Sequence, residues 1–270
     1  MTSPRKVAKS SIRAKVLHVI IRSRQIVRRW SFFVWGLPCT LSRLVAYVFR
    51  FRRGASRPIY PSGTPFSDLV RDGSIWVINL DKRCDRRLEY ENEFSSLKLD
   101  FPVRFSAIPS PNGALGCALS HFEVLRRWEQ MGNGGPICVL EDDIEFLVSK
   151  SELERTVRAF LSDSRLDVLL LGYRTRSLAP RLSSGLRIIT NSLTTSGYIV
   201  KPAALQSIVQ SAESSVDLLS KGASPSKGSI DVVWQKLQCR GLIFATGAVR
   251  MARQRRSFSD IEGVMKDRGL

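Results

Sequence analysis

Three consecutive carboxylates close a short apolar run in the middle of the chain. The run extends from Ile137 to Leu140, and Glu141, Asp142 and Asp143 follow it directly. Adjacent negative charges repel one another and are costly to remove from water, so they are stable only in solvent or around a balancing cation. Because hard divalent cations prefer carboxylate oxygens, the pattern predicts an Mg2+ or Mn2+ site at the end of a buried strand.

The spacing within this acidic group selects Glu141 and Asp143 as the ligand pair. On an extended strand, residues i and i+2 point to the same side, so these two carboxylates can share one ion while Asp142 faces elsewhere. A solvated acidic turn that follows a strand is the alternative interpretation.

A basic group follows an earlier apolar strand, which we predict from Ser74 to Leu80. It contains Arg83, Arg86 and Arg87, at the start of a helical stretch. A strand that runs into a turn and a basic helix start can hold phosphate through backbone N–H groups and guanidinium groups. A charged first helical turn on the surface is the alternative.

The other chemical candidate is His121, in a helix predicted to begin near Ala114. It is the only histidine outside the N-terminal extension. A structural histidine held by hydrogen bonds is the alternative to a catalytic or binding role.

Strands and helices alternate from residue 73 onward. Further strands are predicted at 103–108, 166–172 and 242–248 and as two short strands within 186–200, and further helices at 151–161, 201–210 and 230–238. This alternation favours an α/β sandwich with a mainly parallel sheet and helices on both faces. Ligands of such sheets bind beyond the carboxyl ends of the strands, where both charged groups are expected.

The positive charge belongs mainly to the N-terminal part. The chain carries a formal net charge of +18, yet residues 1–67 contain 14 Lys or Arg and no acid, and the remainder is nearly balanced. We therefore divide the chain into a basic, apolar extension (1–56), a linker rich in Pro, Gly and Ser (57–72) and a globular domain (73–270). The balanced domain gives no reason to expect a nucleic-acid partner.

The extension indicates membrane association. Residues 31–49 are mostly apolar, but Pro38 and Arg43 interrupt them and arginines flank both ends. An intramembrane arginine is costly, so we prefer an interfacial helix on anionic lipid to a membrane span; a cleaved targeting segment is a third interpretation. Five widely spaced cysteines give no C-x-x-C pair and no disulfide pattern, and a standard secretory signal is absent. Both observations favour the cytoplasmic face of a membrane.

Six blocks of the domain together resemble glycosyltransferase family 25, the lipopolysaccharide-type galactosyl- and glucosyltransferases, which include the collagen galactosyltransferases. The resemblance covers roughly residues 73–263 and depends on the order and spacing of the blocks. The blocks are VINLDKRCDRR (77–87), GALGCALSH (113–121), VLEDD (139–143), TSGYIVKPAA (195–204), IDVVWQKL (230–237) and QRRSFSDIEG (254–263).

The resemblance implies a GT-A type nucleotide-sugar fold and an inverting, metal-dependent transfer of galactose or glucose from a UDP-sugar to a glycan, glycolipid or protein acceptor. It implies that Glu141 and Asp143 bind the metal, with Asp260 completing the set, and that Asp231 is the catalytic base. An N-cap for the following helix is the alternative role of Asp231. The donor-binding residues that the resemblance implies are Asn79, Leu80, Arg83, Arg86, Arg87, Ser120, His121, Asp142, Gln254 and Ser259.

One departure from the family pattern opens a second hypothesis. Where the family often has an acid after the first glycine of its second block, this chain has Ala114. The alternative function is therefore a catalytically inactive, glycosyltransferase-like binding or scaffold protein at a membrane.

Overall fold

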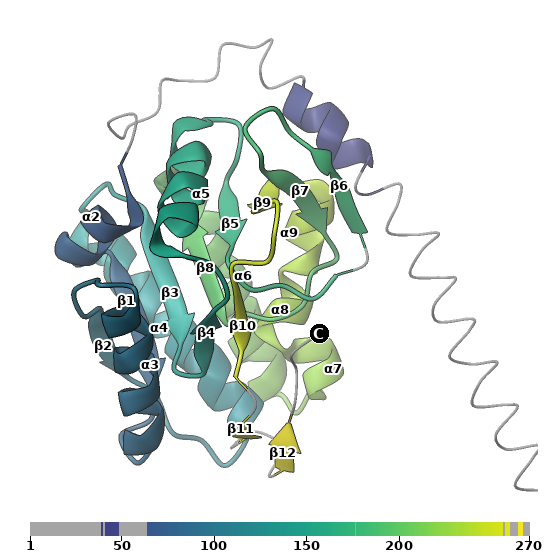
Figure 1. The fold of residues 1–270 in the computed structure, drawn as a ribbon. Coiled ribbons are helices and arrows are strands. Elements are labelled where there is room, and N and C mark those ends of the chain that lie inside the picture. Colours follow the sequence, from purple (N-terminus) through teal and green to yellow (C-terminus); the bar gives the residue numbers. More distant parts are fainter. Residues whose placement is uncertain are drawn as a thin grey trace, which may run out of the picture.

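The computed structural model describes residues 39, 41–48, 64–175, 177–255, 257–259 and 264–266, with backbone alone for 177–180, 257–259 and 264–266 (Figure 1). An eight-stranded sheet forms the centre of the domain, in the order β2-β1-β3-β8-β5-β9-β7-β6. Its strands are β1 (Ile75–Asn79), β2 (Val103–Ser106), β3 (Ile137–Glu141), β5 (Val168–Leu170), β6 (Ser177–Arg181), β7 (Arg187–Thr190), β8 (Gly197–Val200) and β9 (Phe244–Thr246).

Most strands of this sheet run in one direction. β1 pairs in parallel with β2 and β3, and β5 pairs in parallel with β9, whereas β8 and β7 run the opposite way. The α/β class and the mainly parallel sheet are therefore confirmed, and the arrangement is consistent with the GT-A type. The carboxyl ends of β1 and β3 lie side by side, which brings the basic and acidic groups of the sequence to one edge.

Helices cover both faces of the sheet (Figure 1). The helices α2 (Phe66–Arg71), α3 (Cys84–Ser96) and α5 (Lys150–Ser162) pack on one face, and α4 (Gly113–Met131), α6 (Pro202–Ser220), α8 (Ile230–Val233) and α9 (Gln235–Arg240) pack on the other, with α7 (Pro225–Gly228) against α6.

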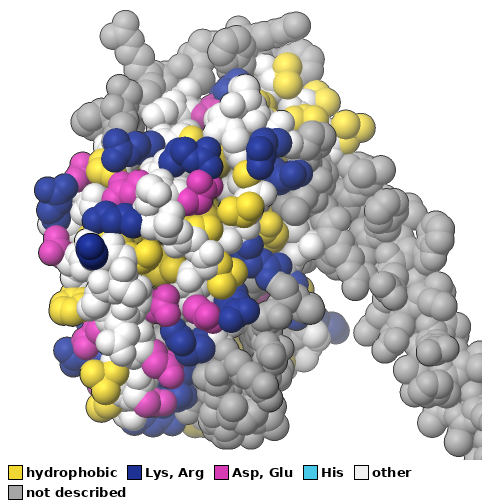
Figure 2. Space-filling view, in the orientation of Figure 1, with side chains coloured by type: hydrophobic (Ala, Val, Ile, Leu, Met, Phe, Trp, Pro, Cys, Tyr) yellow, Lys and Arg dark blue, Asp and Glu magenta, His cyan; other side chains and the backbone are white. Residues whose placement is uncertain are grey.

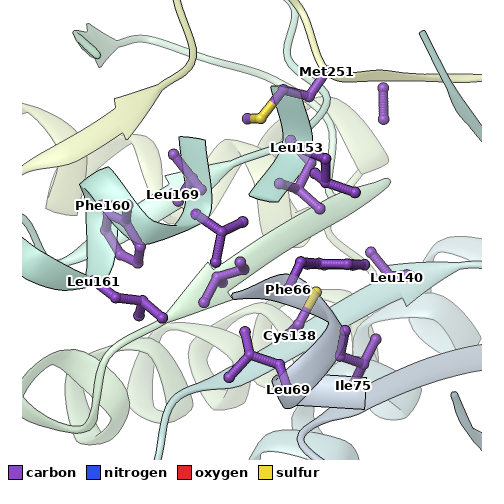
Figure 3. Packing of buried hydrophobic residues seen from close by; sticks show 14 of the residues in the cluster. Phe66, Leu69, Ile75, Cys138, Leu140, Leu153, Phe160, Leu161, Leu169 and Met251 are labelled. Carbon is purple, nitrogen blue, oxygen red and sulfur yellow. The ribbon is translucent and has the colours of Figure 1, made fainter. Parts of the chain in front are cut away.

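Alternation along the buried strands produces this two-sided core. In β1, Ile75 and Val77 belong to the cluster shown in Figure 3, whereas Trp76 and Ile78 belong to the cluster on the opposite face. Side chains alternate between faces with a period of two, so a strand that is apolar throughout can bury both faces.

Short elements differ most from the sequence predictions. Helix α2 lies inside the predicted linker, and its Phe66 and Leu69 are buried in the core. The single helix predicted over 230–238 is two helices, α8 and α9, separated at Trp234. Two small antiparallel pairs were not predicted, β4 (Ile144–Phe146) with β10 (Ala252–Gln254), and β11 (Ser257–Ser259) with β12 (Val264–Lys266).

A helical segment of the N-terminal extension, residues 41–48, packs against the domain. The hydroxyl of Tyr47 donates to a carboxylate oxygen of Asp163 at 2.7 Å, and the guanidinium of Arg165 lies 3.9 Å from the centre of the Tyr47 ring. Arg43, which we had placed in an apolar segment, donates to the carbonyl of Gly241 at 3.2 Å. The rest of the extension, including most of 31–49, lies outside the described residues.

Two further observations concern the partners expected of this chain. Among the described helices, none combines the length and the apolar composition that crossing a membrane requires. On the face of the domain shown in Figure 2, cationic and anionic side chains are interspersed, as the nearly balanced charge of the domain predicts.

Candidate active site

A cavity of about 410 Å³ opens at the carboxyl ends of β1 and β3. It brings together residues that lie far apart in the sequence. Of the residues predicted to form the site, those that line the cavity are Leu80, Arg86, Ser120, Glu141, Asp142, Asp143, Asp231 and Gln254.

Arg86 joins two of the three consecutive carboxylates. Its Nη1 lies 2.8 Å from Oδ1 of Asp142 and 3.6 Å from Oδ2 of Asp143, and both aspartates are more than nine-tenths buried. Burial lowers the pKa of Arg86, but the charges of Asp143 and Asp142 outweigh burial and raise that pKa above its ordinary value. This arginine therefore stays charged and offsets part of the acidic group.

The orientation predicted for Asp142 is wrong, because this residue also faces the cavity. The prediction used the alternation of an extended strand, but β3 ends at Glu141 and Asp142 and Asp143 lie in a turn. Asn79 donates to the second oxygen of Asp142 at 2.8 Å. Burial raises the pKa of Asp142, although Arg86 and Asn79 act in the opposite direction.

Glu141 is held by side chains from distant segments. The hydroxyl of Thr195 donates to its Oε1 at 2.5 Å, and Nε2 of Gln254, on β10, donates to its Oε2 at 3.0 Å. The carboxylate is therefore fixed from the β7–β8 loop and from the C-terminal part of the chain.

His121 lies directly behind Glu141 and is fully buried. Its Nδ1 is 3.0 Å from the hydroxyl of Tyr198, and its Nε2, 3.5 Å from Glu141 Oε1, makes no hydrogen bond with the described residues. Cys117 is close as well, because one ligand atom from each of Cys117, His121 and Glu141 lies within 4.8 Å of the others. These three side chains could hold a metal ion, although no sequence pattern placed Cys117 near one.

Asp231 lies in the first turn of α8, whose N-cap is Ser229. The N-cap alternative for Asp231 is therefore wrong. Its Oδ2 accepts a hydrogen bond from the backbone N–H of Thr194 at 3.0 Å, and both residues line the cavity. Thr194 has φ of +86°, a costly conformation for a β-branched residue. Such strain is typical of functional loops, because the surrounding contacts must hold it in place.

The other residues predicted for the site lie around the cavity or outside it. Arg83 pairs with Asp85, and the exposed Arg87 pairs with Glu91 on the outer side of α3; neither lines the cavity. Ser120 accepts from the N–H of Ile108 and so fixes the loop before α4. The side chains of Ser259 and Asp260 lie outside the described residues.

The two threonines of the β7–β8 loop were not recognisable from the sequence. Thr194 and Thr195 line the cavity and contact Asp231 and Glu141, but a threonine pair in a loop has no distinctive spacing. The only indication in the sequence was the family-like block at 195–204, which begins at Thr195 and directly follows Thr194.

Three solved structures show a distant likeness to this chain. A structure described as a glycosyltransferase involved in the glycosylation of the major capsid of PBCV-1 is 12% identical, with a TM-score of 0.40, over 64% of this chain and 79% of its own. A197 from STIV is 11% identical, with a TM-score of 0.38, over 68% and 93%. A mannose-1-phosphate geranyltransferase from Thermus thermophilus is 12% identical, with a TM-score of 0.37, over 78% and 64%.

No protein-family model matches the chain. No curated protein matches it either. The likeness to the solved structures is too distant to identify a function, so the case for one depends on the residues of the site.

Proposed function

We propose that this chain is a glycosyltransferase that moves a hexose, galactose or glucose, from a UDP-sugar to an acceptor hydroxyl, as its resemblance to glycosyltransferase family 25 implies. One observation carries the proposal. The cavity gathers Arg86, the carboxylates 141–143, Asp231 and Gln254, which come from four of the six family-like blocks. Only the fold brings these blocks together, and they meet where an α/β sheet binds its ligands.

The donor diphosphate would bind beside Arg86 and the acidic group. A phosphate is attracted by cationic side chains and repelled by carboxylates. Among the described residues, four acids line the cavity against the three bases Lys82, Arg86 and Arg255, and Arg86 and Arg255 are already paired with carboxylates, so a bound cation would help a diphosphate to bind beside the acidic group. We propose that Glu141 and Asp143, with Asp260, hold Mn2+ or Mg2+. The burial of Asp143 and the two hydrogen bonds that fix Glu141 fit this role, because immobile carboxylates are good ligands. The ion would supply charge neutralisation for the departing UDP.

Asp231 would act as the general base. The acceptor oxygen forms a bond to the anomeric carbon of the sugar while the bond from that carbon to the diphosphate oxygen breaks. The acceptor proton passes to the Asp231 carboxylate, and the bonding electrons leave with UDP. The hydrogen bond from Thr194 orients that carboxylate in the wall of the cavity. Attack from the face opposite the leaving group inverts the anomeric centre.

The acceptor in this proposal is a glycan, glycolipid or protein at an anionic membrane surface. The basic extension, residues 1–56, would hold the enzyme at that surface through its arginines, lysines and apolar side chains.

UDP release by the full chain tests the proposal. The donors are UDP-galactose, UDP-glucose and their N-acetyl forms, each with Mn2+, Mg2+ or EDTA. We expect slow release of UDP from one donor, which EDTA abolishes and Asp143→Ala removes. Asp217→Ala is the matched control, because Asp217 is an exposed aspartate on α6. Tight UDP binding without turnover over a broad panel of acceptors would instead favour the inactive scaffold. That alternative is based on Ala114, which lies in the cavity wall where the family often has an acid.

A further inference from the structure

A second cavity adjoins the first one. Its volume is about 420 Å³, and the two cavities share the residues Thr194, Asp231 and Gln254 in their walls. Asp231 therefore faces both spaces. If the first cavity holds the donor, the second lies where an acceptor would have to bind for its hydroxyl to reach the same carboxylate.

Three arginines from two described segments line the second cavity. Arg174 follows β5, Arg250 precedes β10, and Arg253 lies on β10. Arg253 is already bound to Glu145 through two hydrogen bonds, of 2.7 and 3.0 Å. No described carboxylate pairs with Arg174 or Arg250, and Asp231 is the only acid among the described residues that line this cavity. Its wall is thus cationic, in contrast to the mixed wall of the first cavity, where four described acids face three bases.

Contacts hold the backbone of Arg174 and the side chain of Arg250. The backbone N–H and carbonyl of Arg174 bond to Leu193 at 3.1 and 3.0 Å, which fixes the loop that carries it. The guanidinium of Arg250 lies 5.2 Å from the centre of the Tyr173 ring, and this cation–π contact restricts its side chain. The cation–π contact leaves the guanidinium of Arg250 less entropy to lose when it binds a planar or tetrahedral oxyanion, whereas the side chain of Arg174 is exposed.

We infer that the second cavity is an acceptor subsite for an anionic glycan, in which Arg174 and Arg250 bind a carboxylate or phosphate group. That the bound anion is the acceptor of the reaction rests on the proposed function. That the cavity binds an anion rests on the two arginines alone. The acceptor would present its negative group to the arginines and its hydroxyl to Asp231. A neutral glycan would leave the two guanidinium groups without a counter-charge and would bind less well.

Anion binding by the full chain tests the inference. The probes are glucuronate and glucose 6-phosphate, with glucose as the neutral comparison, and binding is followed by saturation-transfer NMR in saturating UDP. We expect both anions to bind more tightly than glucose. Arg174→Gln and Arg250→Gln should each weaken anion binding about tenfold, because a charge-assisted hydrogen bond is lost. Arg155→Gln, which changes an exposed arginine on α5, should not.

Two results would overturn the inference: equal binding of glucose and the anions, or anion binding that survives both substitutions. Loss of anion binding in Arg86→Gln but not in the other variants would place the anion in the first cavity and would also refute it. The proposed function fails separately. If UDP does not bind but the anions still require Arg174 and Arg250, the donor assignment is wrong and the anion subsite stands. If UDP binds and the anions do not, the donor assignment stands and the anion subsite is wrong.

Discussion

Replacing Arg86 with methionine should cost much of the stability of the domain. The side chain of Arg86 is 11% exposed, and among the described residues it bridges Asp142 and Asp143. The side chains of these two aspartates are 8% and 12% exposed. Methionine keeps most of the apolar stem but removes the charge, so two buried carboxylates lose their counter-ion. Breaking a buried ion pair on one side costs about 3 kcal/mol or more, and we expect a loss of about 3 kcal/mol in the free energy of unfolding at pH 7.

The loss should depend on pH in a defined direction. Burial already raises the pKa of Asp142, and removal of Arg86 raises it further. A carboxyl with a raised pKa in the folded state favours folding at low pH, and this contribution disappears as the pH rises through that pKa. The difference between Arg86→Met and the unmodified chain should therefore shrink as the pH falls below neutrality toward the raised pKa of Asp142. The double variant with Asp142→Asn should recover part of the loss at neutral pH.

Urea unfolding followed by tryptophan fluorescence measures this difference. Arg87→Met is the matched control, because the next arginine on α3 is 54% exposed and pairs only with Glu91 among the described carboxylates. We expect the control to lose much less stability than Arg86→Met, because an exposed ion pair contributes little. If Arg86→Met lost no more than Arg87→Met, or if its loss were independent of pH, the description of a buried acidic pair held by Arg86 would be wrong.

Two other predictions concern the base and a buried lysine. Asp231→Asn should keep the hydrogen bond from Thr194, because the amide oxygen still accepts. It should lower kcat about 10²-fold or more and leave UDP binding unchanged. Normal turnover by this variant would exclude Asp231 as the base. Burial lowers the pKa of Lys201 to about 8, so the folded chain loses this proton at a lower pH than the unfolded chain does. Stability should thus rise by about 2 kcal/mol between about pH 8 and 10, and Lys201→Met should remove that rise in urea titrations.

The parts of the fold that could be predicted are those with strong local signals. The runs from Ile75 to Asn79 and from Ile137 to Leu140 are apolar almost throughout and lead into charged groups, so the strands and their shared edge could be recognised. Helix α2 could not, since six residues show too little periodicity to identify a helix. Its burial depends on contacts with α5, far along the chain.

Within the site, residue types were predictable but orientations were not. Sequence alone could not separate Arg86 from Arg87, because one helical position decides which guanidinium turns toward the carboxylates. The alternation rule failed for Asp142 because β3 ends one residue earlier. The two threonines and the strained backbone of Thr194 arise from how the β7–β8 loop is held by α8 and β3, and such long-range contacts leave no local pattern.

The hydrogen bond between Gln254 and Glu141 links residues 113 positions apart, and this separation matters while the chain is being made. A ribosome adds about 5–20 residues per second, so the acidic group waits for roughly 6 to 23 s after its own synthesis before Gln254 exists. During that interval β1 and β3 can pair and Arg86 can bind Asp142. The part of the cavity wall that β10 contributes cannot yet form. A nascent chain therefore carries its acids and their arginine before it can enclose a ligand, and the cavity is completed only after Gln254 has been made.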